Sequence, residues 1–399
     1  MHLLVVDISW PPTTFLQRLL YGLADAGLFI TVVCSQRPER TWLARPNCRW
    51  LRLPGWHGGK VNFIFNTITY GLIAIPKAPS YYRNLRSIIP KDSLRDRLKY
   101  WSNSLPLVSG HWDVVYFPWN SAAIAYLPLA PYLPPMVVSC RGSQVNIAPH
   151  EPERAGFAEG LRQTFQKAAA VHCVSEAIQN EAMQYGLEAS KAWIIRPAVD
   201  PAFFCPSADK KIGNPLRIIT TGSMIWRKGY EYALRALRLL LDQGIAAEFQ
   251  LIGDGPERAR VLYTIDDLEL HQQVHLHGKQ PSAKVRELLQ AADIFLLTSL
   301  SEGISNAALE AMACGLPVVT TDCGGMREAV TDGVEGFVVP VGDSEAIAAA
   351  LARLARDPAL RERMGQAARQ RVLRDFTLKE QIQAFVALFE AAKAVGRSS

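Results

Sequence analysis

The feature that most constrains this chain is an alternation in residues 216–355, where short apolar runs take turns with longer segments of helical periodicity. The apolar runs predict strands at 216–221, 247–252, 274–277, 293–298, 318–320 and 336–339. The periodic segments predict helices at 230–243, 256–268, 282–291 and 344–355. Strands separated by helices pair in parallel, and the helices cover both faces of the sheet. The second half is therefore predicted to be a doubly wound α/β domain.

The first half shows a looser version of the same pattern. Strands are predicted at 3–8, 29–34, 113–117, 136–140 and 192–195, and helices at 14–26 and 178–185. A polar stretch flanked by prolines, 198–215, predicts an interdomain linker. We therefore expect a first domain at 1–200, a second at 201–375 and a terminal helix at 376–399.

Composition supports two folded domains without a membrane span. The chain has 399 residues and is 49% hydrophobic, which excludes a disordered protein. Seven scattered cysteines form no C-x-x-C pair, a pattern typical of reduced thiols. Asp7 interrupts the first apolar run, so no signal peptide is predicted, and no run reaches the ~20 residues that span a bilayer. We expect a cytoplasmic protein.

The positive charge is concentrated in residues 37–100, which hold 13 Lys and Arg against 3 Asp and Glu and are rich in aromatic residues. Basic and aromatic residues together are typical of membrane interfaces, so peripheral contact with an anionic membrane, on its inner face, is one interpretation. An irregular solvated subdomain is the other. No nucleic-acid-binding module is present, so no nucleic acid is expected.

Two carboxylates seven residues apart mark the candidate site in the second half. Glu302 lies in a turn after the predicted strand 293–298, and Glu310 lies in the following helix, which ends at Gly315 and Pro317. The helix start at Ser305 or Asn306 offers free N–H groups and a positive dipole end to a phosphate.

This segment, 301–317, resembles the E-x7-E signature of retaining glycosyltransferases of family 4. The resemblance implies the GT-B architecture, in which two Rossmann-like domains face a central cleft and a C-terminal helix crosses back to the first domain. It implies that Glu302 contacts the donor sugar and that Glu310 binds the ribose hydroxyls. The backbone of Gly303, Ile304 and Ser305 would face the donor diphosphate.

A second loop, 222–229, follows a strand and precedes a helix, as phosphate-binding loops do. It resembles the family's G-R-L-x-x-x-K-G loop, which binds the donor diphosphate through Arg and Lys. Gly222 and Lys228 match, Ser223 replaces the Arg, and Arg227 is a candidate for the missing charge. The turn with Gly253 and Gly255 resembles the family's G-x-G-P turn near the nucleotide base, although a purely structural turn is at least as plausible.

The first domain departs from the family. Its first loop has Thr13 and Thr14 in place of a Gly-Gly pair, and we expect N-capping as their main role, with acceptor contact as the alternative. The family's D-V-x-H-x-H motif has lost both His residues here. Arg141 replaces a later His, and could hold an anion in the cleft or form an ordinary surface salt bridge.

The resemblance implies a retaining, metal-independent transfer of sugar from a nucleotide-diphosphate sugar to a sugar or lipid-linked hydroxyl acceptor, with no cofactor. Lys228, Arg227 and Glu302 would be the catalytic residues. In the family the attack is thought to occur on the face of the departing phosphate. Two alternatives stay open: another GT-B enzyme, such as a phosphorylase or an epimerase, and a non-catalytic nucleotide-sugar-binding or scaffold protein.

Overall fold

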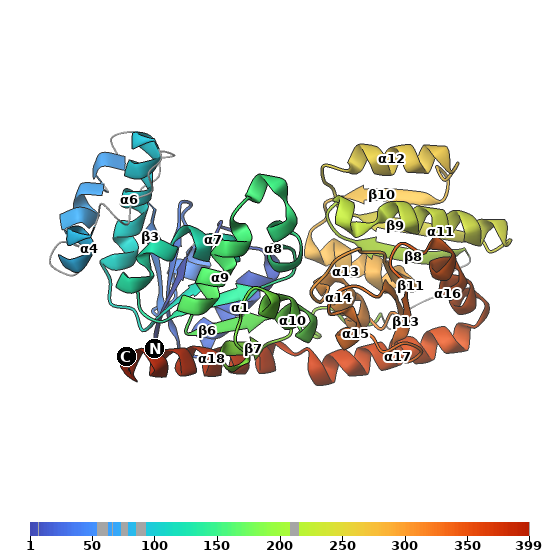
Figure 1. Cartoon of the computed structure of the whole chain (residues 1–399). Helices are drawn as coiled ribbons and strands as arrows, with labels where there is room; N and C mark the ends of the chain where they lie inside the picture. Colours follow the sequence, from blue (N-terminus) through green and yellow to red (C-terminus); the bar gives the residue numbers. More distant parts are fainter. Residues whose placement is uncertain are drawn as a thin grey trace. The chain divides into compact units, whose positions relative to one another are not determined.

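The computed structural model describes residues 1–6, 8–53, 63–65, 67–72, 79–84, 93–207 and 215–398. The chain forms two compact units (Figure 1). The first unit contains Met1–Ile195 together with Ile382–Ser399, and the second contains Arg196–Gln381. Each unit is built around one parallel β-sheet, as the sequence predicts.

The sheet of the first unit has seven parallel strands in the order β3-β2-β1-β4-β5-β6-β7. The strands are β1 (His2–Val6), β2 (Phe29–Cys34), β3 (Cys48–Arg52), β4 (Val114–Phe117), β5 (Met136–Cys140), β6 (Ala170–Cys173) and β7 (Ala192–Ile194). β3 and β6 are absent from the predicted elements. The order reverses between β1 and β4, so helices cover both faces.

The helices of the first unit are α1 (Thr14–Asp25), α2 (Arg40–Leu43), α4 (Pro79–Arg83), α6 (Leu94–Val108), α7 (Asn120–Ala125), α8 (Ser143–Asn146), α9 (Phe157–Lys167) and α10 (Glu176–Gln184). Residues 63–65 and 67–72 are also helical. Alternate residues of β1 enter different cores: Leu3 packs in the α1 cluster and Leu4 packs in the α9 and α10 cluster. This two-faced burial explains why the strands are almost entirely apolar.

The second unit has six parallel strands in the order β10-β9-β8-β11-β12-β13. They are β8 (Leu216–Thr221), β9 (Ala247–Ile252), β10 (Val274–Gly278), β11 (Ile294–Leu297), β12 (Val318–Thr321) and β13 (Gly336–Val339). The helices are α11 (Tyr230–Asp242), α12 (Arg258–Asp267), α13 (Ser282–Ala291), α14 (Asn306–Ala313), α15 (Met326–Ala329), α16 (Ser344–Arg356) and α17 (Pro358–Asp375). The predicted α/β alternation is confirmed here.

The last helix, α18 (Leu378–Ser398), returns to the first unit. Its buried side chains, Phe385, Leu388, Phe389 and Ala392, pack in the same core as β1 and α1. Lys393 Nζ lies 2.8 Å from Asp113 Oδ1, beside the start of β4. The predicted return of the C-terminal helix to the first domain is confirmed. Among the residues that the structure describes, no helix is long and apolar enough to cross a bilayer.

Candidate active site

Two loops of the second unit leave neighbouring strands where the strand order reverses. β8 lies between β9 and β11, so the crossovers on its two sides run in opposite directions. In open parallel sheets such a reversal opens a crevice at the carboxyl ends of the strands, where ligands bind. The loop after β8 carries residues 222–229, and the loop after β11 carries residues 298–305. Both predicted donor-binding segments therefore leave the same edge of one sheet.

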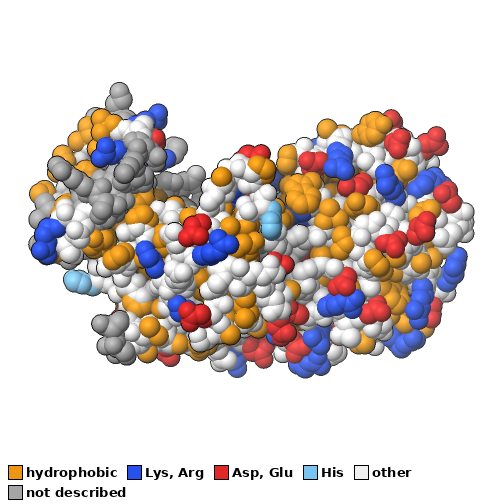
Figure 2. Space-filling view, in the orientation of Figure 1, with side chains coloured by type: hydrophobic (Ala, Val, Ile, Leu, Met, Phe, Trp, Pro, Cys, Tyr) orange, Lys and Arg blue, Asp and Glu red, His pale blue; other side chains and the backbone are white. Residues whose placement is uncertain are grey.

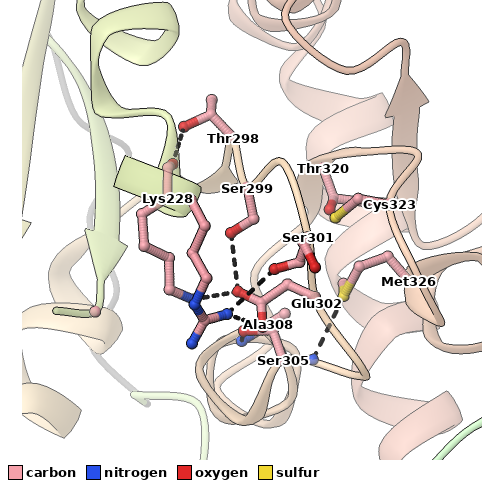
Figure 3. A network of polar contacts seen from close by, with 12 residues as sticks. Lys228, Thr298, Ser299, Ser301, Glu302, Ser305, Ala308, Thr320, Cys323 and Met326 are labelled. Atoms are coloured by element: carbon pink, nitrogen blue, oxygen red, sulfur yellow. Dashed lines mark hydrogen bonds and ion pairs between the residues drawn. The ribbon is translucent and has the colours of Figure 1, made fainter. Parts of the chain in front are cut away.

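Backbone and side-chain hydrogen bonds tie the two loops together. The amide of Leu300 donates to the carbonyl of Arg227 over 2.7 Å. The hydroxyl of Thr298 donates to the carbonyl of Lys228 over 3.0 Å (Figure 3). Because both bonds involve the backbone on the β8 side, the positions of Arg227 and Lys228 are fixed relative to β11.

The Glu302 carboxylate is the centre of a charged cluster (Figure 3). Its Oε1 forms an ion pair with Lys228 Nζ and accepts a hydrogen bond of 2.9 Å from Ser299 Oγ. Its Oε2 lies 3.5 Å from Arg227 Nη1, which also donates to the carbonyl of Ser301 over 3.2 Å. Glu302 is only 8% exposed, so one buried acid is held by two cations and a hydroxyl.

The cluster keeps Glu302 ionised. Burial on its own raises the pKa of a carboxyl, but the positive charges of Lys228 and Arg227 outweigh it, and the pKa of Glu302 lies below its usual value. At neutral pH the side chain is therefore a fixed acceptor with no proton to donate. The nearby phenol of Tyr230 is buried, which raises its pKa, and it donates to the carbonyl of Gly222 over 3.0 Å.

Close backbone contacts require glycine beside this cluster. Gly253 has φ +147°, and a Cβ at this position would lie 1.8 Å from the carbonyl oxygen of Gly222. Gly324 has φ +53°, and its Cβ would lie 1.8 Å from the carbonyl oxygen of Glu302. Any side chain would push these loops apart. The structural interpretation of the Gly253 turn is thus well founded, and the turn also shapes the loop that carries Lys228.

The start of α14 is organised by Ser305. Its Oγ accepts from the amide of Ala308 over 3.4 Å, and its own amide donates to Met326 Sδ over 3.4 Å. A thioether is a weak acceptor, so an anion could replace it. Asn306 is the first residue of α14, and Glu310 lies partly buried one turn further along.

The other predicted donor-binding residues frame these loops. Ser223 is exposed after β8. The amide of Gly255 donates to Asp254 Oδ1 over 2.8 Å. The carbonyl of Gly303 accepts from the amide of Gly325 over 2.7 Å, and the Ile304 side chain is buried in the core.

In the first unit, the predicted capping role of Thr13 is wrong. Thr13 occupies the N-cap position of α1, but its side chain makes no capping hydrogen bond, and both Thr13 and Thr14 are exposed. The Thr13 carbonyl accepts a hydrogen bond from the amide of Gln17 over 2.9 Å. Arg141 follows β5 and lies against Phe15 of α1, with its guanidinium carbon 4.6 Å from the ring centroid. The exposed hydroxyls of Thr13 and Thr14 are thus available for contacts with a ligand.

The sequence did not predict Ser299, Thr298 or Tyr230 as part of the site. Ser299 precedes Glu302 by three residues, so its hydroxyl can reach the carboxylate within one turn of chain. Thr298 bonds the carbonyl of Lys228, 70 residues away in the chain, and Tyr230 bonds the carbonyl of Gly222 at the other end of the same loop. No local pattern distinguishes them from ordinary core residues, because their role depends on which backbone carbonyls lie beside them in the fold.

The fold and the site together define an α/β protein with two Rossmann-like sheets and a charged cluster at the switch point of the second. Two family models match the chain: Glycosyltransferase Family 4 over residues 13–203 and Glycosyl transferases group 1 over residues 207–371. The chain belongs to glycosyltransferase family 4. The resemblance drawn from residues 301–317 is therefore confirmed.

Curated relatives include two bacterial proteins named as biosynthetic glycosyltransferases. The putative colanic acid biosynthesis glycosyltransferase WcaL of Salmonella typhimurium is 33% identical over 222 residues, 54% of this chain and 55% of the relative. The amylovoran biosynthesis glycosyltransferase AmsK of Erwinia amylovora is 35% identical over 192 residues, 47% of each chain. The matches span about half the length of these relatives.

Solved structures share the whole fold at low identity. The complex of Anabaena HepE with UDP has a TM-score of 0.71 at 18% identity, covering 98% of this chain and 100% of HepE. Sucrose-phosphate synthase from Thermosynechococcus elongatus has a TM-score of 0.76 at 18% identity, covering 99% and 100%. These similarities confirm the GT-B fold that the sequence predicts.

Proposed function

We propose that this protein transfers a sugar from a nucleotide-diphosphate sugar to a hydroxyl acceptor, with retention of the anomeric configuration and without a metal ion. The observation that carries the proposal is the buried Glu302 carboxylate held by Lys228 and Arg227 at the switch point of the second sheet. Cations beside an acid suit a reaction in which a diphosphate departs from a sugar. The cations can stabilise the negative charge of the diphosphate, and the acid can hold the sugar.

Lys228 and Arg227 would stabilise the charge that develops on the leaving diphosphate. A bound diphosphate brings oxyanions that compete with Glu302 for the same N–H groups, so the ion pairs are expected to be shared when donor binds. Glu302, partly released, would accept hydrogen bonds from hydroxyls of the donor sugar. Glu302 would thus hold the two cations in place before the donor binds.

The remaining donor contacts follow the start of α14. The amides near Ile304, Ser305 and Asn306 would face the diphosphate, and Glu310 would bind the ribose hydroxyls. Gly222, Ser223, Gly253, Gly255 and Gly303 would line the path of the backbone around the nucleotide. HepE binds UDP, which supports testing UDP-sugars first.

The first unit would bind the acceptor, and the second unit the donor. Thr13, Thr14 and Arg141 lie around the first turn of α1, at the carboxyl edge of the first sheet, where exposed hydroxyls and a cation can contact a sugar. The acceptor would be a sugar or a lipid-linked hydroxyl compound, in the synthesis of a polysaccharide or glycolipid.

Peripheral contact with an anionic membrane fits the described part of residues 37–100. The helical residues 63–65 and 67–72 bury Phe63 and Thr67 and expose Phe65 by 68% and Ile68 by 56%. Thr67 Oγ1 lies 2.6 Å from Ser102 Oγ, so residues 67–72 pack on α6, whose first turns carry exposed Arg95, Arg97 and Lys99. Figure 2 shows hydrophobic and basic side chains together at the upper left. Residues 54–62, 66, 73–78 and 85–92 lie outside the described part.

Sedimentation with vesicles tests this contact. The full chain should bind vesicles of phosphatidylglycerol and phosphatidylcholine, with binding weakened by salt. Replacing Phe65 and Ile68 by Ser should reduce binding, whereas the same change at Tyr263 and Leu262, exposed on α12, should not. Equal binding by all variants, or none by the native chain, would exclude this surface as the contact.

Donor binding and hydrolysis by the purified chain test the proposed reaction. Calorimetry and NMR with UDP-, GDP- and ADP-sugars should reveal one donor that binds and slowly releases its sugar with retained configuration. Turnover that needs inorganic phosphate would indicate a phosphorylase, and an epimerised donor would indicate an epimerase. Binding without hydrolysis or transfer to any acceptor would indicate a non-catalytic protein.

Replacing Glu310 and replacing Glu302 should have different effects on binding and turnover. Glu310→Ala should weaken nucleotide binding about tenfold, the loss of charge-assisted hydrogen bonds to two hydroxyls. Glu302→Ala should chiefly lower turnover. Glu362→Ala, an exposed acid on α17, is the matched control. Unchanged affinity and rate in both variants would contradict the assignment of the site.

A further inference from the structure

We propose that the first unit holds an oxyanion-binding site at Arg141, and that Tyr116, Ser139 and His172 form a buried hydrogen-bond relay that positions its guanidinium. The site would bind a phosphate or carboxylate group of a substrate. The assignment of this group to a substrate rests on the proposed transferase function. The anion site and the relay are argued from the structure alone and do not depend on that function.

The relay is a continuous chain of short contacts. Arg141 Nη2 donates to Tyr116 Oη over 3.1 Å, and Tyr116 Oη lies 2.7 Å from Ser139 Oγ. Ser139 Oγ lies 2.7 Å from His172 Nδ1, and His172 Nε2 lies 2.8 Å from the carbonyl oxygen of Ile195. Tyr116, Ser139 and His172 are at most 1% exposed.

The direction of every hydrogen bond in the relay follows from its two ends. A carbonyl only accepts, so His172 Nε2 must carry a proton, and a neutral ring then leaves Nδ1 as an acceptor. Ser139 must donate to Nδ1 and therefore accepts from Tyr116. The Tyr116 proton is thus committed to Ser139, and its oxygen faces Arg141 purely as an acceptor.

The surroundings keep His172 neutral. Burial, and then the positive charge of Arg141, lower the pKa of His172 to about 3. The edge of the His172 ring meets Phe385 of α18, with centroids 4.6 Å apart, and Tyr116 meets Phe389 at 5.3 Å. The returning helix therefore covers the relay and excludes water from it.

The relay does not neutralise the positive charge of the Arg141 guanidinium. Its described partners are the Tyr116 oxygen and the face of Phe15, both neutral. Its Nε is buried and has no hydrogen-bond partner among the described residues. None of these contacts neutralises the charge of the guanidinium, and its planar shape suits a two-oxygen contact with phosphate or carboxylate.

The role of Arg141 can be tested by NMR on the full chain. The Nε–Hε signal of Arg141, assigned by its loss in Arg141→Lys, should move and saturate when inorganic phosphate is added. No movement up to high phosphate would overturn the site. Repeating the titration with saturating UDP separates the two sources: a phosphate response blocked by UDP points to the donor diphosphate, and one that persists points to an acidic group of the acceptor.

The relay is tested by two tyrosine variants. Tyr116→Phe should weaken phosphate binding at Arg141 about tenfold, because the acceptor that holds the guanidinium is lost. Tyr81→Phe, which also removes a buried hydroxyl bonded to a serine, Ser104, should leave it unchanged. Equal effects of the two variants would overturn the positioning role, as would ¹⁵N shifts that place the His172 proton on Nδ1.

Discussion

Removing the charge of Lys228 should destabilise the second unit more than removing both charges of its ion pair. In Lys228→Met the polar partners that the described part of the chain leaves to the buried Glu302 are Arg227, 3.5 Å away, and Ser299. Breaking a buried pair from one side costs about 3–5 kcal/mol, and the remaining cation places the loss near the lower value, about 3 kcal/mol. For a domain of this size that corresponds to a fall in Tm of about 6–12 °C.

The double variant Lys228→Met/Glu302→Gln should recover most of this loss, because the buried carboxylate is gone and Gln can still accept from Ser299. Arg227, whose side chain is 24% exposed, keeps its hydrogen bond to the Ser301 carbonyl. Thermal unfolding of the full chain by calorimetry measures both. Arg238→Met, which breaks an exposed pair with Asp242, should change the free energy of unfolding by less than about 1 kcal/mol. A double variant as unstable as Lys228→Met, or a stable Lys228→Met, would refute the reasoning.

Two further predictions concern stability. The unfolded chain protonates His172 near its ordinary pKa of 6.5, whereas the folded chain does so only near 3, so lowering the pH from 7 to 5 should cost the first unit about 2 kcal/mol. In urea titrations at the two pH values, His172→Gln should lose this part of the pH dependence and His271→Gln, an exposed control, should keep it; identical slopes would argue against a neutral buried ring. Gly253→Ala should lower Tm more than Gly186→Ala, since both have positive φ but only Gly253 faces a carbonyl, at 1.8 Å; equal losses would mean that the loop yields.

The sequence predicted most of the second sheet because each strand there is a short apolar run between helical segments. It missed α17, whose buried stripe consists of Arg361, Met364, Gly365, Ala368 and Val372. Such a stripe of small and charged residues has little hydrophobic periodicity. It also missed β6, since a histidine stands in the middle of that strand and satisfies its polar atoms only through β5 and Ile195.

The candidate site divides in the same way. The spacing of Glu302 and Glu310 and the loop around Lys228 are local patterns, so sequence alone could indicate them and the family they belong to. The capping role of Thr13 was wrong because capping depends on the rotamer of the side chain, which the residue type does not fix.

The sequence by itself determined the two α/β domains, the terminal helix and the segments that carry the charged groups, because apolar periodicity and turn residues act within a few positions of the chain. The return of that helix to the first domain was implied by the family resemblance. Only the tertiary structure decided that Lys228 and Arg227 meet Glu302, 74 and 75 residues away, and that His172 supports Arg141 through two hydroxyls. These contacts arise where parallel strands end side by side, and strand order in a sheet is set by packing between elements distant in sequence.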